Sequence, residues 1–122
     1  MSSNPPRPLI AIAVSRQPPD ENTSGQHSTG HRYVTAIVEC ANGVPFLLPA
    51  LGDGQEFNDV VRLIDGLMLP GGRANIEPHH YGGPPFPDDE PIDPDRDSTV
   101  LPLIRACIDH AIPVFGSCRG IQ

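Results

Sequence analysis

Four short, largely apolar runs predict four strands. The runs occupy residues 9–14, 44–48, 67–69 and 113–117. The first run is almost wholly apolar, which is typical of a strand covered on both faces, as in a parallel sheet. We therefore expect these four strands to share one sheet.

Between the runs, apolar residues recur at helical spacing in three stretches. Asn42-Gly43 is expected to end the first helix with a left-handed cap, and Asp65-Gly66 to end the second. For the third helix, residues 97–99 are candidate caps, and Pro102 fits a first turn capped by Thr99. Cysteines on these stripes are expected in the core. The stripes are Tyr33, Ala36, Ile37, Cys40 and Ala41; Phe57, Val60, Val61 and Ile64; and Val100, Ile104, Cys107, Ile108 and Ala111.

The order of elements is β-α-β-α-β-loop-α-β, which predicts a doubly wound α/β sheet, mainly parallel, with right-handed crossovers. Residues 1–8 are expected to be a disordered leader, and residues 9–122 to belong to one domain. The polar segment 16–32 and the segment 73–97, rich in prolines and acids, are expected to be loops.

Composition excludes several classes of function. All eight basic residues are arginines, so neither a Schiff-base lysine nor a P-loop lysine is available. The net charge of −7 argues against nucleic acid as a partner. No segment of the sequence is apolar for long enough to span a membrane. Three cysteines without metal spacing favour a reduced, cytoplasmic protein without a disulfide framework.

The strongest chemical signal is Gly-x-Cys-x-Gly at 116–120, directly after an apolar strand. This pattern is a nucleophile elbow with cysteine in the place of serine. A helix beginning there would lower the pKa of the Cys118 thiol, and the backbone N–H of Arg119 would point toward a forming oxyanion. The alternative is that Cys118 is a small buried apolar residue.

A second signal is the pair Gly71-Gly72, which follows the strand at 67–69. Sites in open α/β sheets form at the carboxyl ends of the strands. Consecutive glycines there can turn backbone N–H groups into a cavity and supply a second oxyanion donor. The alternative is an ordinary turn that leaves the strand.

These motifs resemble the class I glutamine amidotransferase-like superfamily and, within it, the gamma-glutamyl-gamma-aminobutyrate hydrolase family. The resemblance covers residues 10–122 and implies a flavodoxin-like fold with helices on both faces of the sheet. The segments at 75–82 and 93–97 distinguish this family within the superfamily. The landmarks are Tyr-Val-Thr-Ala-Ile at 33–37, Gly-Val-Pro at 43–45, Asp-Gly-Leu-Met-Leu-Pro-Gly-Gly at 65–72, Asn-Ile-Glu-Pro-His-His-Tyr-Gly at 75–82, Asp-Pro-Asp-Arg-Asp at 93–97 and Ile-Pro-Val-Phe-Gly-Ser-Cys-Arg-Gly-Ile-Gln at 112–122.

The resemblance implies a role for each matching residue. Cys118 corresponds to the nucleophile that attacks a gamma-glutamyl amide and forms a thioester. Gly71, Gly72 and the N–H of Arg119 correspond to the oxyanion hole, and Gln122 to a position near the glutamyl pocket. The implied partner is a small gamma-glutamyl substrate, and the implied chemistry uses neither a metal nor an organic cofactor. Whether the protein forms a homo-oligomer is left open.

The family's histidine base and its orienting glutamate lie downstream of the nucleophile, whereas this sequence ends at Gln122. None of the histidines is a credible substitute, so we expect a fragment, truncated after the nucleophile strand, with little turnover of its own. A non-catalytic binding remnant and the glutaminase subunit of an amidotransferase are the alternatives. The histidines are His27, His31, His79, His80 and His110.

Two further clusters are weighed and set aside as metal sites. The acids at 93, 95 and 97 lack the glycine and glutamate of a calcium loop, so we expect a solvated acidic loop that caps the next helix. His27 and His31 have helical metal spacing in a segment that does not look helical, which argues against zinc. The segment 79–81 could line a substrate rim or be a plain surface loop.

Overall fold

A computed structural model describes residues 6–52 and 56–117 of the chain. Its centre is a four-stranded parallel sheet in the order β4-β1-β5-β6. The register aligns Leu9 with Val44 between β1 and β4, and Leu67 with Val114 between β5 and β6. All four predicted strands are therefore confirmed. Their bounds are Leu9–Ala13 for β1, Val44–Leu48 for β4, Gly66–Leu69 for β5 and Val114–Gly116 for β6.

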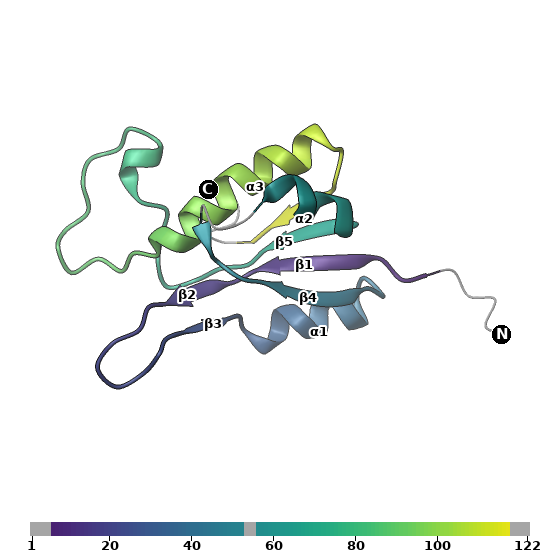
Figure 1. The fold of residues 1–122 in the computed structure, drawn as a ribbon, viewed down its shortest axis with the longest axis horizontal. Helices are drawn as coiled ribbons and strands as arrows, with labels where there is room; N and C mark the ends of the chain where they lie inside the picture. The colour runs from purple at the N-terminus through teal and green to yellow at the C-terminus, as the bar shows by residue number, and fades with distance from the viewer. Residues whose placement is uncertain (1–5, 53–55, 118–122) are drawn as a thin grey trace.

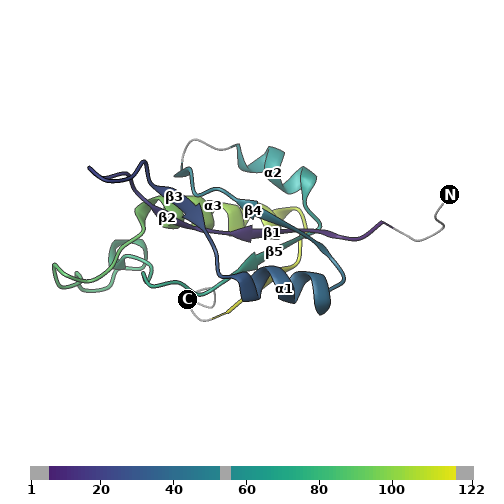
Figure 2. The same cartoon turned by 90° about the horizontal axis from the view of Figure 1, so that it is seen from below.

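Helices cover both faces of this sheet, as the predicted doubly wound α/β class requires (Figure 1). Helix α1 (His31–Glu39) lies on one face, and α2 (Phe57–Leu63) and α3 (Pro94–Asp109) lie on the other (Figure 2).

Side chains alternate across the sheet between two cores. Ala11 and Leu67 pack toward α2 and α3, whereas Ile12 and Met68 pack toward α1 with Tyr33 and Ile37.

Segment 16–32 is not a loop throughout, as the sequence had suggested. Strand β2 (Ser15–Gln17) pairs antiparallel with β3 (Gln26–Ser28), and α1 begins at His31, two residues earlier than predicted. Strands of three polar residues carry too little alternation to be detected, which explains the error. The hairpin extends from the carboxyl end of β1 (Figure 1).

The start of α3 was also predicted wrongly. Asp93 is the N-cap, Pro94 occupies the first turn, and residues 97–99 lie inside the helix. Pro102 is an interior proline on an exposed position rather than a first-turn residue. The helix buries Val100, Leu103 and Cys107, while Ile108 is 69% exposed, so the apolar stripe is rotated from the predicted one.

The two cysteines on predicted apolar stripes behave differently. Cys107 is fully buried, and desolvation raises the pKa of its thiol. Cys40 is exposed, so its expected place in the core is wrong. It is the C-cap of α1, where the chain turns away through Asn42 at φ 48°, the left-handed cap that the sequence predicted.

In the described parts of the chain, no helix is both long and apolar enough to cross a membrane.

Candidate functional site

The carboxyl ends of β1, β5 and β6 meet at one edge of the sheet, where sites form in this architecture. Beyond β5 the chain continues into Pro70-Gly71-Gly72, and beyond β6 into Ser117. The Ser117 N–H donates to the Leu69 carbonyl at 3.0 Å, so the residue before Cys118 lies beside the start of the glycine turn.

Three of the residues predicted to form the site lie outside the described residues. They are Cys118, Arg119 and Gln122. The geometry of the site is therefore built from Gly71, Gly72 and their surroundings.

The Pro70–Gly71 peptide is held on both of its polar sides. The Pro70 carbonyl accepts from Arg96 Nη2 at 2.6 Å. The Gly71 N–H donates to the Tyr33 hydroxyl at 3.2 Å. Arg96 comes from α3 and Tyr33 from α1, so helices on opposite faces of the sheet fix one peptide group.

Gly72 differs from Gly71 in having its amide available. Within residues 6–52 and 56–117, the Gly72 N–H has no hydrogen-bond acceptor, and the residue is exposed. A Cβ at this position would collide with the Arg96 guanidinium, so the close approach requires glycine. Of the two glycines predicted as oxyanion donors, only Gly72 therefore offers an uncommitted N–H.

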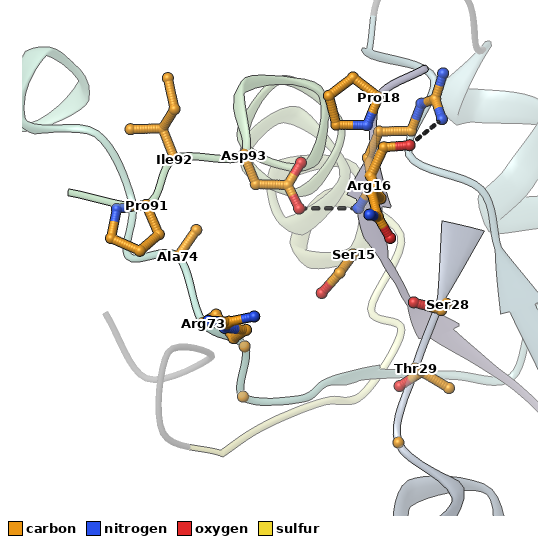
Figure 3. A pocket seen from close by; sticks show the side chains of 14 residues that line it. Ser15, Arg16, Pro18, Ser28, Thr29, Arg73, Ala74, Pro91, Ile92 and Asp93 are labelled. Atoms are coloured by element: carbon orange, nitrogen blue, oxygen red, sulfur yellow. Dashed lines mark hydrogen bonds between the residues drawn. The ribbon is translucent and has the colours of Figure 1, made fainter. Parts of the chain in front are cut away.

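A cavity of about 620 Å³ opens beside this turn (Figure 3). Its walls come from the β2–β3 hairpin, from the turn after β5 and from the segment that leads into α3. They include Ser15, Arg16, Thr29, Gly71, Gly72, Arg73, Ile92 and Asp93. A second hollow adjoins the same turn, and its lining includes His31 and Tyr33.

Two arginines give the cavity positive charge, but they are engaged differently. Arg16 Nε lies 3.7 Å from Asp95 Oδ2, and its Nη1 donates to the Gln17 carbonyl at 2.7 Å. Arg73 is exposed, and no carboxylate of the described residues pairs with it. Arg73 is therefore the cation of this cavity that is available to an anionic ligand.

The segment 93–97 is a buried polar network and not the solvated loop that the sequence suggested. Asp93, Arg96 and Asp97 are 6%, 2% and 0% exposed. Asp93, and not one of residues 97–99, caps the helix, because its Oδ1 accepts from the Arg96 N–H at 3.2 Å. Its Oδ2 accepts from the Arg16 N–H at 2.9 Å and so joins the hairpin to α3.

Arg96 and Asp97 extend this network toward the site. Arg96 Nη1 donates to the Ser15 Oγ at 3.0 Å, which ties the start of β2 to the glycine turn. Asp97 Oδ2 accepts from the Glu77 N–H at 3.0 Å and anchors the segment before the short helix η2 (Pro78–His80). Sequence reasoning missed Arg96, although an arginine inside Asp-Pro-x-Arg-Asp, one turn after a capping aspartate, was a usable signal.

The histidines are distributed away from the main cavity. His80 Nε2 lies 3.9 Å from the buried Asp97 Oδ2, and His79 packs against His80 with ring centroids 4.0 Å apart. His27 Nδ1 accepts from the Ala50 N–H at 3.1 Å. In the described parts of the chain, no three His, Cys, Asp or Glu side chains converge closely enough to hold a metal ion.

Comparison with known proteins identifies relatives over almost the whole chain. The sequence matches the peptidase C26 family over residues 8–122. It is 36% identical to a gamma-glutamyl-gamma-aminobutyrate hydrolase of Escherichia coli O157:H7 over 120 residues, which cover 94% of this chain and 44% of that protein. The corresponding hydrolase of Shigella sonnei is 35% identical with the same coverage.

A glutamine amidotransferase-like protein of Rickettsia prowazekii is more distant. It is 34% identical over 90 residues, which cover 74% of this chain and 31% of that protein. The chain thus spans less than half the length of the curated relatives that it matches.

Proposed function

Because the chain belongs to the peptidase C26 family, we propose that it supplies the nucleophile and the oxyanion hole of an enzyme that hydrolyses gamma-glutamyl amides. The observation that carries this proposal is the hydrogen bond from Ser117 to Leu69. It joins the strand before Cys118 to the strand before Gly71-Gly72 at the edge of the sheet where catalysis is expected.

In the proposed reaction, the Cys118 thiolate attacks the gamma-carbonyl carbon of the substrate. The electron pair of the C=O bond moves onto oxygen, where the N–H groups of Gly72 and Arg119 stabilise the negative charge. Collapse of this intermediate breaks the C–N bond, the amine takes up a proton and leaves, and a thioester remains on Cys118. Water then cleaves the thioester, releasing glutamate and restoring the thiol.

The proton transfers require a general base, and we assign none of the described histidines to that role. Among the hydrogen bonds and ion pairs of the described residues, His27 and His80 are engaged elsewhere, with Ala50 and Asp97. Gln122 is proposed to contact the glutamyl group. The curated hydrolases are named for a substrate whose two halves both carry carboxylates, and Arg73 offers a positive charge to one of them.

The test uses the complete gene product that contains these residues and gamma-glutamyl-gamma-aminobutyrate as substrate. We expect Cys118→Ala to lower turnover by more than about 10³-fold while substrate binding, measured by calorimetry, is retained. Cys40→Ala is the matched control, because Cys40 is exposed at the end of α1 and should not affect turnover. Turnover retained in Cys118→Ala would refute the proposal.

A further inference from the structure

The buried guanidinium of Arg96 needs an explanation beyond packing. The side chain is 2% exposed, and burying a charge in a protein is costly unless polar groups surround it. Two of its hydrogen bonds go to neutral oxygens, the Pro70 carbonyl and the Ser15 hydroxyl. Pro70 directly follows β5, and Ser15 begins β2 shortly after the end of β1. Both residues therefore lie at the start of a segment that lines the cavity.

A peptide group is planar, and in the trans form its C=O and N–H point in opposite directions. In the Pro70–Gly71 peptide, Arg96 binds the carbonyl oxygen and Tyr33 binds the N–H. Rotation of this peptide would break both hydrogen bonds at once. The next N–H along the chain is that of Gly72, so the fixed peptide limits the directions in which that N–H can point.

Without such restraint, two consecutive glycines would be a poor scaffold for an oxyanion donor. Glycine populates more of φ/ψ space than any other residue, so an unrestrained Gly71-Gly72 turn would spread its N–H groups over many orientations. A catalytic hydrogen-bond donor contributes most when it is already aligned before the reaction begins. The restraint therefore has to come from outside the turn.

We propose that Arg96 and Tyr33 are positioning residues that clamp the Pro70–Gly71 peptide and thereby align the Gly72 N–H for the oxyanion. This inference rests on the proposed function, and it names two side chains that do not touch the substrate. The Arg96 guanidinium also lies so close to Gly72 that a Cβ at this position would collide with it. The clamp is anchored in turn by Asp93, which caps α3 and accepts from the Arg96 N–H.

The clamp can be tested in this chain without any turnover, by ¹⁵N relaxation of the Gly72 amide. We expect an order parameter near that of rigid backbone, about 0.85, in the parent chain. Tyr33→Phe keeps the ring and removes the hydroxyl. Arg96→Lys keeps the charge and removes the guanidinium group, whose two terminal nitrogens make the hydrogen bonds. Either change should lower the Gly72 order parameter toward the flexible range, below about 0.6. An unchanged value in both variants would overturn the proposal.

Matched controls separate the clamp from general effects on each helix. Thr35→Val removes a hydroxyl from α1 that donates to the Arg32 carbonyl at 3.0 Å, a hydrogen bond within the helix. Arg105→Lys makes the corresponding change at an exposed position of α3. Both controls should leave the Gly72 amide as rigid as in the parent. A loss of rigidity in the controls equal to that in the clamp variants would also overturn the proposal.

Kinetics in the complete gene product supply the functional readout. A misaligned oxyanion donor weakens the transition state and leaves the substrate complex unchanged. Tyr33→Phe and Arg96→Lys should therefore lower kcat by about 10- to 100-fold with KM changed less than about twofold. A change confined to KM would overturn the clamp. The proposed function fails separately, if Cys118→Ala keeps its turnover.

Discussion

The most informative test of the architecture around the cavity is the substitution Asp93→Ala. The Asp93 carboxylate accepts from the Arg96 N–H at 3.2 Å as the N-cap of α3, and from the Arg16 N–H at 2.9 Å in the hairpin. The residue is 6% exposed, so water is poorly placed to replace either bond. One side chain therefore joins two segments that wall the same cavity.

The expected cost follows from these two hydrogen bonds. Loss of an N-cap aspartate costs about 1 kcal/mol. Leaving the Arg16 N–H without its acceptor adds about 1–3 kcal/mol. The free energy of unfolding should therefore fall by about 2–4 kcal/mol, a large part of the stability of an ordinary domain.

Urea unfolding followed by circular dichroism measures this change, with Glu56→Ala as the matched control. Glu56 is the exposed N-cap of α2, and among residues 6–52 and 56–117 its carboxylate accepts only from the Asn58 N–H, at 3.3 Å, so its loss should cost about 0.5 kcal/mol. Asp93→Asn keeps one acceptor oxygen and should fall between the two, which preserves the test if Asp93→Ala does not fold. Equal effects of Asp93→Ala and Glu56→Ala would refute this reasoning.

Three further predictions concern the thiols and the charge of the cavity. Alkylation of this chain across pH, followed by peptide mass spectrometry, should show Cys118 reacting at a lower pH than the exposed Cys40; equal reactivity of the two thiols at every pH would favour a binding remnant over a catalytic elbow. Burial raises the pKa of Cys107 above its unfolded value, so the unfolded state loses its proton first and stability should fall as pH rises above about 8.5. Urea unfolding between pH 7 and 10 should show a smaller fall in Cys107→Ala, and equal falls would contradict this assignment. In the complete gene product, Arg73→Gln should raise KM for the substrate several-fold with little change in kcat, and an unchanged KM would exclude its contact with a carboxylate.

The central sheet could be predicted because its strands are continuous apolar runs. In a strand covered on both faces, such as β5, every residue has an apolar environment, so the pattern is visible without knowledge of the neighbours. The edge strand β4 was predicted in the same way, although Phe46 and Leu47 are about half exposed. The hairpin of β2 and β3 could not be predicted, because its polar strands gain their order from pairing with each other.

Gly71-Gly72 was singled out from the sequence whereas Arg96 was not, and the difference has a physical reason. Gly71-Gly72 could be singled out as a candidate because it follows a buried strand at the carboxyl edge of the sheet, where sites of open α/β folds form, although an ordinary turn explains the pair equally well. Arginine is usually found on the protein surface, so the residue type alone gives no sign that Arg96 is buried. Its burial depends on the start of the helix at Asp93. With the helix begun at Thr99, as the sequence suggested, Arg96 would have belonged to a solvated loop. The error at the cap therefore concealed the side chain that holds the glycine turn.

The same dependence explains why a glycine pair alone is weak evidence for an oxyanion hole. The Gly71 N–H donates to the Tyr33 hydroxyl. Of the two glycines, Gly72 is the one whose N–H has no acceptor among the described residues. The difference between the two glycines is made by side chains from α1 and α3, more than twenty residues away in either direction. A useful signature for this kind of site would therefore combine the glycine pair with the arginine that follows a capping aspartate, because we propose that the glycine pair supplies the donor and that the arginine restrains it.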